Sequence, residues 1–574
     1  MFIPPGEKIV ETKKCRLSGK EFFVTDKDLE FYDKVSPIFL WKKYTIPSPT
    51  LCPEERMRRR ISYRNQRNVY LRKSSFSGET IFSMHSTNKA YPVYENDIYY
   101  SDQWNPLEYG LKYNPDISIF EQINSLALEV PHFARSCSLL ENSDYCNNAN
   151  NLKDSYLSFN GWNSEKLYYT AMFVRSEMCI DCLSIYECRE SYECIDCNNS
   201  ERCFYGHALT RCSDCFICDS CTGCNDCFSC ANLVNRSYCI ANKQYTKEDY
   251  FKQLQTLDIP SLVPKVRAWI ATQPKRYFEW VKVENSIGNH IVNVSDVYHC
   301  FECSDCEKLR YCTNIKTGKN LMDVDNFWWN PEWCYECCVV GHNVQNLLFC
   351  ADVWKDVADV LYSQDCNSIQ NCFWCVWLHN HEHHCILNTS YSVHEYETLA
   401  WGIIDAMRHE WIWGEFFSIA DSPWWYNESL AQEYFPMTKE EVQKNWWHWY
   451  DEPIKSFEGA SIIPLSISEY DEKIVGFETA QKNIDDLLGS TLICEVTWKP
   501  FKIIKQELVF YIEHSLPIPT KHHDQRHKER MVLRNPRTFF ERTCAECQKP
   551  IITTYAPERP EKVLCEECYR KNVY

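Results

Sequence analysis

The chain has 574 residues, which is long enough for three or more domains that each bury a core. Its formal net charge of −18 argues against a protein that binds nucleic acid over its whole surface, although a local basic patch stays open. Its 35 cysteines would suggest disulfides in a short secreted chain, but the start, MFIPPGEKIVETKK, lacks the apolar segment of a signal peptide. No run of about 18 apolar residues exists to span a membrane. We therefore expect a cytoplasmic protein whose cysteines are free thiols or metal thiolates.

Residues 1–105 are predicted to form a double zinc-ribbon module that has lost its ligands. Residues 71–99 align without gaps to residues 541–569, where two CxxC pairs occur. The four cysteine positions of that segment hold Ser74, Ser77, Glu95 and Ile98 here. Isoleucine cannot bind a metal, so we expect none at this site. The other ribbon of the module would need ligands at Cys15, Ser18, Cys52 and Glu55 and is also short of four good ones.

A basic segment within this module, ERMRRRISYRNQRNVYLRK, is a candidate nucleic-acid contact. On a helix, arginines 56, 60, 64 and 67 would share one face, and a basic helix beside a ribbon is a common way to hold phosphates. The alternative is a solvated face that pairs with the acidic remainder of the chain. The candidate residues are Arg56, Arg58, Arg59, Arg60, Arg64, Arg67, Arg72 and Lys73.

Residues 106–250 are predicted to form a first cysteine-rich solenoid with a cap, because residues 164–235 repeat with a period of twelve. The fifth position of each block is aromatic or Ile throughout, from Tyr168 to Ile240. Twelve residues are too few for a pair of helices. They suit one coil of a narrow β-solenoid or half a coil of a wider β-helix, with cysteines and bulky aromatic residues stacked inside.

The cysteines of these blocks have three interpretations. We favour a structural ladder, because reduced cysteine is among the most buried residue types and packs as a small apolar side chain. The alternatives are zinc held between neighbouring CxxC pairs and, less favoured, disulfides. The predicted ladder comprises Cys179, Cys203, Cys215, Cys227 and Cys239.

The middle of the chain repeats this organisation. Residues 251–288 are predicted to be a helical connector, and residues 289–396 a second solenoid with a cap. The cap CIANKQYTKEDY at residues 239–250 matches CILNTSYSVHEY at residues 385–396. Residues 397–490 form a tryptophan-rich helical or irregular region, whose aromatic side chains we expect to plug the open end of a solenoid.

Residues 491–574 are predicted to be a second double ribbon with one intact metal site. CAEC and CEEC supply two CxxC pairs on a short segment that can form a hairpin, as in a four-cysteine zinc ribbon. We expect about one structural zinc ion per chain. Its ligands would be Cys544, Cys547, Cys565 and Cys568.

The ribbon pairs, the CxxC repeats, the cap CIANKQYTKEDY and the segment EYFPMTKEE resemble a family of uncharacterised cysteine-rich proteins with flanking zinc ribbons. Such proteins are encoded in candidate-phyla (Patescibacteria-like) and some giant-virus genomes, and some carry a CaiB/BaiF label that we do not transfer. The resemblance covers nearly the whole chain and implies zinc ribbons on both sides of the cysteine repeats. This sequence departs from the family by lacking cysteines at residues 18, 55, 74, 77, 95 and 98.

The sequence therefore predicts a mainly β protein with helical inserts, in which two β-solenoids are flanked by duplicated zinc-ribbon modules. We interpret it as a non-enzymatic, zinc-binding repeat scaffold that presents solenoid surfaces to a macromolecular partner, with a protein favoured. A second hypothesis is a nucleic-acid-binding protein, for RNA rather than DNA, that uses the arginine-rich segment. A third hypothesis is an enzyme. Its type would be unrecognised, because the sequence contains no nucleophile elbow, P-loop, GxGxxG or HExxH motif.

Overall fold

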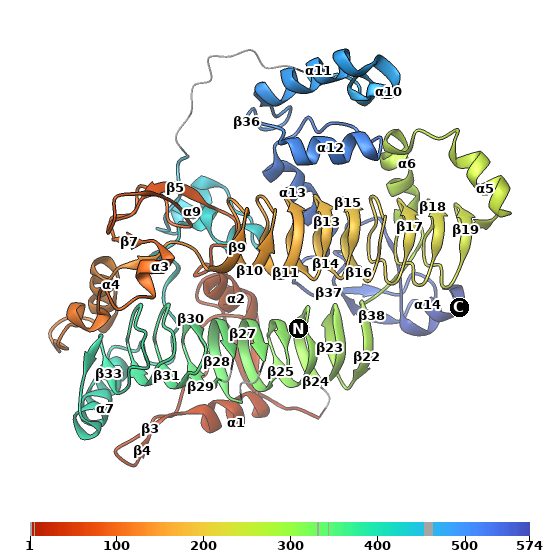
Figure 1. Cartoon of the computed structure of the whole chain (residues 1–574). Coiled ribbons are helices and arrows are strands. Elements are labelled where there is room, and N and C mark those ends of the chain that lie inside the picture. Colours follow the sequence, from red (N-terminus) through yellow and green to blue (C-terminus); the bar gives the residue numbers. More distant parts are fainter. Residues whose placement is uncertain (1–2, 5, 330–331, 343, 453–462, 574) are drawn as a thin grey trace.

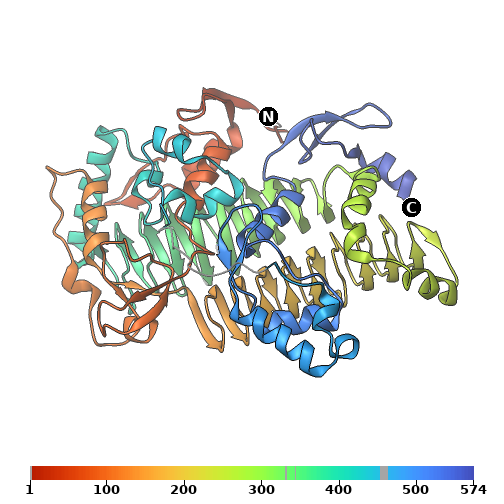
Figure 2. The same cartoon turned by 90° about the horizontal axis from the view of Figure 1, so that it is seen from above.

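The computed structural model describes residues 3–4, 6–329, 332–342, 344–452 and 463–573. Two β-solenoids lie side by side, and their coils advance in opposite directions (Figures 1 and 2). The first runs from β9 (Cys137–Glu141) to β19 (Ser237–Ile240), and the second from β22 (Trp280–Glu284) to β33 (Cys385–Ile386). The predicted mainly β fold with helical inserts and solenoid repeats is therefore confirmed.

One coil of the first solenoid contains twelve residues. Cys215 in β17 (Ser213–Phe216) pairs in parallel with Cys227 in β18 (Asn225–Phe228), and Cys227 pairs with Cys239. Every third residue points into the core, so a coil has four sides of three residues. This register selects the narrow solenoid and excludes half a coil of a wider helix.

A left-handed residue precedes most of the inward-pointing positions and turns the chain at each corner. Ile217 and Ser220, which precede two core cysteines, have φ of 52° and 54°. Asparagine and aspartate adopt this conformation more readily than other non-glycine residues, and they are frequent at these corners. Several coils of the second solenoid have thirteen residues instead, as between Leu321 and Cys334.

The bulky aromatic residues of the repeat lie outside the coil, which corrects the prediction that they stack inside with the cysteines. Phe204 and Phe216 meet edge to face on the outer side of the coil with ring centroids 5.3 Å apart, and Phe510 of α12 (Lys505–Glu513) packs 6.2 Å from Phe204. Helix α6 (Ile259–Ala271) contributes to the same apolar cluster. The prediction failed because only one residue of each three-residue side points inward, so the residue after the core cysteine must face out.

The two caps close their solenoids in the same way. In each, the last parallel strand turns back into a short antiparallel strand, β20 (Lys243–Gln244) or β34 (Thr389–Ser390). Asn242 accepts from the Ala231 backbone N–H at 2.9 Å and donates to its carbonyl at 3.0 Å. Asn388 makes the same two bonds to Val376, at 3.0 and 2.8 Å. The matching cap sequences thus satisfy the exposed strand edge with one asparagine.

Each terminal module docks on the solenoid that is more distant in the sequence. In the N-terminal module, α1 (Asp26–Val35) and α2 (Pro53–Ile61) lie against the second solenoid, with α2 between the two (Figure 1). In the C-terminal module, α12 and α13 (His523–Leu533) cover the first solenoid. The modules therefore join the two solenoids into one body.

The remaining segments cover edges and ends. Residues 106–136, which the prediction placed in the first solenoid, contain η1 (Pro106–Tyr109) and α4 (Ile119–Glu129). The connector holds α5 (Lys247–Leu254) and α6, and α7 (Val393–His409) follows the second cap. Trp413 of the tryptophan-rich region packs on the second solenoid, 6.0 Å from the ring of Tyr362. Among the described residues, no helix combines the length and apolar character needed to cross a membrane.

Candidate metal centre

The four cysteines predicted to bind zinc come together. Cys544 and Cys547 lie in the turn between β37 (Phe540–Thr543) and β38 (Pro550–Thr553). Cys565 follows β39 (Lys562–Leu564), and Cys568 lies in the first turns of α14 (Glu566–Val573). All four sulfur atoms lie within 4.8 Å of one another, and the sulfurs of Cys547 and Cys565 are 3.7 Å apart. The cluster could hold a metal ion.

The backbone of the first cysteine turn favours a thiolate. The N–H of Cys544 donates to the Lys549 carbonyl at 2.8 Å, and the N–H of Gln548, whose φ is 60°, donates to the Cys544 carbonyl at 3.0 Å. The N–H of Cys565 donates to the Cys544 sulfur at 3.3 Å. Burial raises the pKa of Cys544, but backbone N–H groups that point at the sulfur outweigh it and lower the pKa to about 6. Thiolate is the form that binds metal.

The centre is tied to the connector between the solenoids. Strand β21 (Pro274–Arg276) pairs in parallel with β39. Arg276 donates to both carboxylate oxygens of Glu566 at 2.6 and 2.7 Å, next to Cys565 of the cluster. A metal that fixes this cluster would therefore also fix the end of the connector.

The same backbone turn occurs at three other positions, at Cys15, Ser74 and Cys494. Their N–H groups donate to the carbonyls of Lys20, Glu79 and Lys499 at 2.8, 2.8 and 2.9 Å. The left-handed residue of each turn is Gly19, Gly78 or Trp498, with φ of 69°, 74° and 59°. The fold has thus kept four copies of the cysteine turn, although only one keeps four cysteines.

Other contacts replace the missing ligands. The Ser74 hydroxyl donates to Glu95, and the Ser18 hydroxyl lies 3.7 Å from the Cys52 sulfur. In the copy at Cys494, a second group of close ligand atoms comprises residues His522, His523 and Asp524. Asp524 also accepts a bond from Arg67 at 3.3 Å, so a cation already lies beside that group. These two groups are the ones within the described part of the chain that bring three or more ligand atoms together.

The predicted ladder cysteines lie inside the first solenoid, each at most 2 % exposed (residues 179, 203, 215, 227 and 239). The Cys215 sulfur lies 3.3 Å from the Ser213 carbonyl oxygen and 3.5 Å from that of Cys224, and its single S–H can donate to either acceptor. Burial raises the pKa of Cys239 to about 11 and that of Cys179 well above its usual value. A protonated thiol that donates to the backbone is the form expected of a packing residue.

The arginine-rich segment lies between the solenoids. The helical pattern predicted that Arg64 and Arg67 share one helical face with Arg56 and Arg60. This prediction was wrong, because helix α2 ends at Ile61. The buried members of the segment are Arg56, Arg59, Arg60 and Arg64, the partly buried ones Arg58, Arg67 and Arg72, and Lys73 is exposed. The buried ones have no surface to offer a phosphate while the solenoids are together.

Carboxylates of the second solenoid neutralise the arginines of α2. Arg56 and Arg60 both contact Asp323, at 2.9 and 3.0 Å, and Arg59 contacts Glu336 at 3.2 Å. Sequence reasoning missed these carboxylates because they are separated from α2 by more than 260 positions. The signal that could have found them is an acidic residue at a corner of the repeat, where it faces out of the coil.

Comparisons with known proteins add little. No family model matches the chain, and no curated protein does. One similar solved structure is described as that of a "putative acetyltransferase from Desulfovibrio desulfuricans G20", with 8% sequence identity and a TM-score of 0.10. The match covers 39% of this chain and 63% of that one, so it spans less than two thirds of that protein. A TM-score this low supports no conclusion about function.

Proposed function

We propose that this protein is a zinc-containing repeat scaffold, in which Cys544, Cys547, Cys565 and Cys568 bind one structural zinc ion and the solenoids present surfaces to a partner protein. The observation that carries the metal assignment is the mutual approach of all four sulfur atoms within 4.8 Å. The scaffold assignment rests on the exposed solenoid faces described below.

Sulfur-only ligation favours zinc over hard cations, which prefer oxygen. Zinc–sulfur bonds of about 2.3 Å in a tetrahedron place the sulfurs about 3.8 Å apart. The 3.7 Å between Cys547 and Cys565 agrees with this edge. Four protein ligands leave no open position for water or substrate, so the role of the ion is structural.

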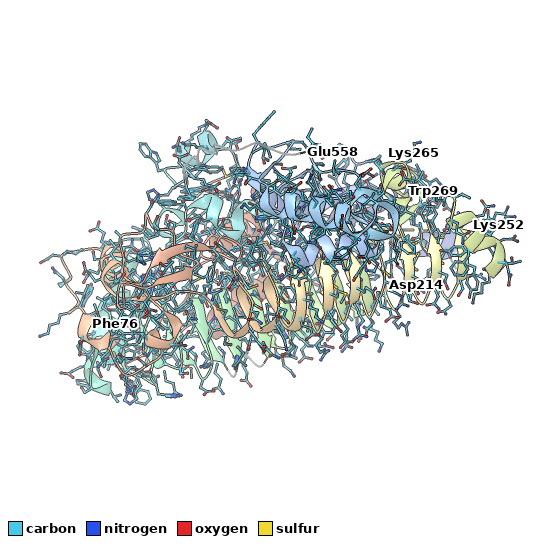
Figure 3. The ribbon with its side chains drawn as sticks, turned by 45° about the horizontal axis from the view of Figure 1, so that its top comes forward. Phe76, Asp214, Lys252, Lys265, Trp269 and Glu558 are labelled. Carbon is cyan, nitrogen blue, oxygen red and sulfur yellow. The ribbon has the colours of Figure 1, made fainter. Side chains whose placement is uncertain are left out.

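The first solenoid presents an exposed face with charges in register from coil to coil. Arg189 contacts Glu177 at 2.6 Å, and Arg202 contacts Asp214 at 2.8 Å, in each case twelve residues apart. Asp214 is on the outer side of the coils (Figure 3). Exposed pairs of this kind contribute little stability, about 0–1 kcal/mol each, so their regular spacing suits recognition better than folding.

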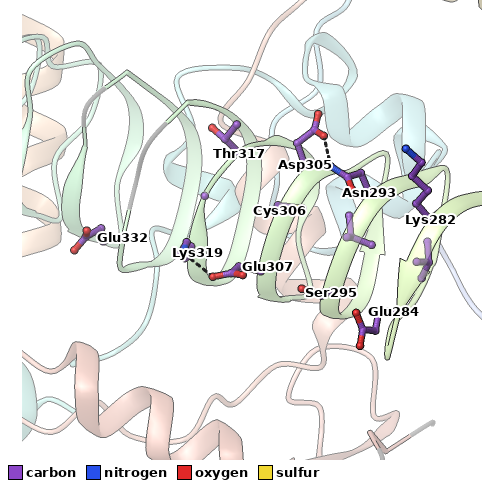
Figure 4. Close-up of a pocket in the computed structure, with 13 residues that line it drawn as sticks. Lys282, Glu284, Asn293, Ser295, Asp305, Cys306, Glu307, Thr317, Lys319 and Glu332 are labelled. Atoms are coloured by element: carbon purple, nitrogen blue, oxygen red, sulfur yellow. Dashed lines mark hydrogen bonds and ion pairs between the residues drawn. The ribbon is translucent and has the colours of Figure 1, made fainter.

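The second solenoid adds a surface groove with a volume of 830 Å³. Its two rims are rows of polar side chains from successive coils, including the bonded pairs Asn293–Asp305 at 2.8 Å and Glu307–Lys319 at 2.7 Å (Figure 4). The inward-pointing residues Val283, Val294 and Cys306 are apolar, and Gly318, the next residue of that column, has no side chain. A groove that crosses several coils suits an extended partner segment.

Metal analysis of the purified, reduced full chain tests the metal assignment. We expect about one zinc per chain, lost in a Cys547→Ser variant and kept in a Ser77→Ala variant at a turn without cysteines. Cobalt substitution should give the absorption of tetrahedral thiolate ligation. Four or more tightly bound zinc ions would instead make the solenoid cysteines metal ligands.

The scaffold assignment needs a binding readout. Once a partner protein is identified by crosslinking, Arg189→Glu combined with Arg202→Glu should weaken its binding by reversing charges on the exposed face. The same substitutions should leave zinc content and unfolding temperature unchanged. A catalytic activity that depends on residues of the groove would contradict the non-enzymatic assignment.

A further inference from the structure

The two solenoids correspond coil by coil, which allows their contacts to be compared. Their caps match at Cys239 and Cys385, and the strand register carries this match backwards one coil at a time. Several coils of the second solenoid are one residue longer, so the offset between corresponding residues becomes smaller toward the earlier coils. There, Cys179 corresponds to Leu321, an offset of 142 residues. In the terminal modules, the arginines correspond with an offset of 470 residues, as Arg60 does to Arg530.

Corresponding residues make the same contacts between module and solenoid in the two halves. The Arg56 guanidinium lies 5.2 Å from the ring centre of Tyr311, and the Arg526 guanidinium lies 4.7 Å from that of Tyr169. Arg526 is the counterpart of Arg56, and Tyr169 is the counterpart of Tyr311. The two halves therefore use the same docking geometry. A position where one half lacks a contact that the other half makes can indicate a local difference in function.

The correspondence breaks at Arg64. Its counterpart Arg534 has two carboxylate partners, Glu302 at 2.8 Å and Asp196 at 2.9 Å. The position equivalent to Glu302 in the first solenoid is Asn160, and Arg64 donates to its side-chain oxygen at 3.0 Å. The position equivalent to Asp196 is residue 339, a valine. Both carboxylates are thus absent around Arg64.

Arg64 is a buried charge that makes no ion pair with a carboxylate in the part of the chain that the structure describes, and the carboxylates of Asp352 and Glu433 attract it only from outside ion-pair distance. Only 4 % of the surface of Arg64 is exposed to solvent. Besides Asn160, it contacts the Gln66 amide, whose oxygen, when turned toward Arg64, accepts from Nε at 2.9 Å and Nη2 at 3.0 Å. An unpaired buried charge costs several kcal/mol unless an ion of opposite sign offsets it.

A small cavity lies beside this guanidinium. Its lining includes Arg64, Gln66, Asn160 and Arg537, from both solenoids and both terminal modules, and also Asp325, whose carboxylate is paired with Arg60 at 2.7 Å. The cavity is small. The centre of a water-sized sphere can move within a volume of 10 Å³, which is about enough room for one water molecule or a single small ion. Arg537 adds a buried Nε–H that has no hydrogen-bond partner among the described residues. The cavity therefore offers positive charge and an unused donor.

We propose that this cavity binds one small monovalent anion, chloride in an ordinary buffer, which takes the place of the missing carboxylates beside Arg64. A water molecule would satisfy hydrogen bonds but would leave the charge uncompensated. The occupant must be compact because the cavity has no room for sulfate or a carboxylic acid. The anion would help to hold the two solenoids together at the point where the duplicated ion pairs are absent.

The test measures the unfolding temperature of the zinc-loaded full chain in sodium chloride and in sodium gluconate of equal ionic strength. Gluconate is too large for the cavity. Above the dissociation constant, each tenfold increase in chloride should raise Tm by about 1 °C in a protein of this size. Asn160→Asp, which restores a carboxylate, should abolish the chloride dependence and stabilise the protein in gluconate.

Two controls separate the site from general salt effects. Asn163→Asp adds a charge at an exposed corner of the neighbouring side and should leave the chloride dependence intact. Crystals grown in bromide should show an anomalous peak within hydrogen-bonding distance of Arg64. The proposal is overturned if the wild-type Tm is the same in the two salts, if Asn160→Asp keeps the chloride dependence, or if bromide is found only elsewhere.

Discussion

Arg60 donates to Asp323 at 3.0 Å between α2 and the second solenoid, and both side chains are fully buried. The counterpart pair, Arg530 and Asp181, has a distance of 2.9 Å between α13 and the first solenoid. In both solenoids the aspartate occupies a left-handed corner, with φ of 55° at Asp181 and 56° at Asp323. Each terminal module is therefore anchored to a solenoid by the same buried charge pair.

Removing the carboxylate of either pair should strongly destabilise the protein. Asp323→Asn leaves Arg56 and Arg60 buried without this partner, and a broken buried pair costs about 3–5 kcal/mol. Asp181→Asn should have a similar effect through Arg526 and Arg530. Urea unfolding followed by circular dichroism measures the loss. Glu177→Gln, which breaks an exposed pair, is the control and should cost about 0–1 kcal/mol. Equal effects of the buried and exposed substitutions would contradict the docking role.

The outer aromatic ladder gives a second prediction. Phe204 is 6 % exposed and packs between Phe216 and α12, so Phe204→Ala should cost about 3–5 kcal/mol. Phe216 is half-buried, and its replacement by alanine should cost less, about 1–2 kcal/mol. Cys215→Ser should be mild, because Ser191 already occupies that inward column two coils earlier. A larger loss for Phe216→Ala than for Phe204→Ala would place Phe216 inside the coil.

The sequence predicted the features that depend on local spacing. The period of twelve, the matching caps and the four cysteines that come together can all be read from short segments. The direction of Phe216 could not, because it depends on a side of three residues with a left-handed corner, which a twelve-residue period does not specify. The partners of the α2 arginines were not predicted, because Asp323 is 263 positions from Arg60 and local spacing does not connect an acidic corner of the repeat with that helix.

Metal removal gives the third prediction. Zinc bound as proposed would fix Cys544 and Cys568 across the short strands β37 to β39, so a chelator should lower Tm and loosen β21 where it pairs with β39. Hydrogen exchange should become faster in residues 274–276 and 562–573 and stay unchanged in the coils of the first solenoid. Readdition of zinc should restore both Tm and protection. Faster exchange throughout the solenoid cysteines after chelation would show that they, too, bind metal.

The pH dependence of stability should reveal the carboxylate pairs that join the two halves. Burial raises the pKa of Glu302, but Arg537 and Arg534 outweigh it and lower the pKa to about 2. A carboxylate whose pKa is depressed on folding stabilises the protein above its unfolded pKa of about 4.3, and the contribution is lost as pH falls through the folded value. We therefore expect a loss of about 3 kcal/mol from this group between about pH 5 and pH 2.

The variant Glu302→Gln isolates that contribution. It should lower stability at neutral pH, where the wild-type carboxylate is ionised and paired, and it should reduce the difference between neutral and acidic pH by the same amount. It also leaves Arg534 with Asp196 alone, which makes this half more like the half around Arg64. Unfolding free energies at a series of pH values measure the effect. If the variant and the wild type lose stability in parallel down to pH 2, Glu302 does not stabilise the junction through its charge.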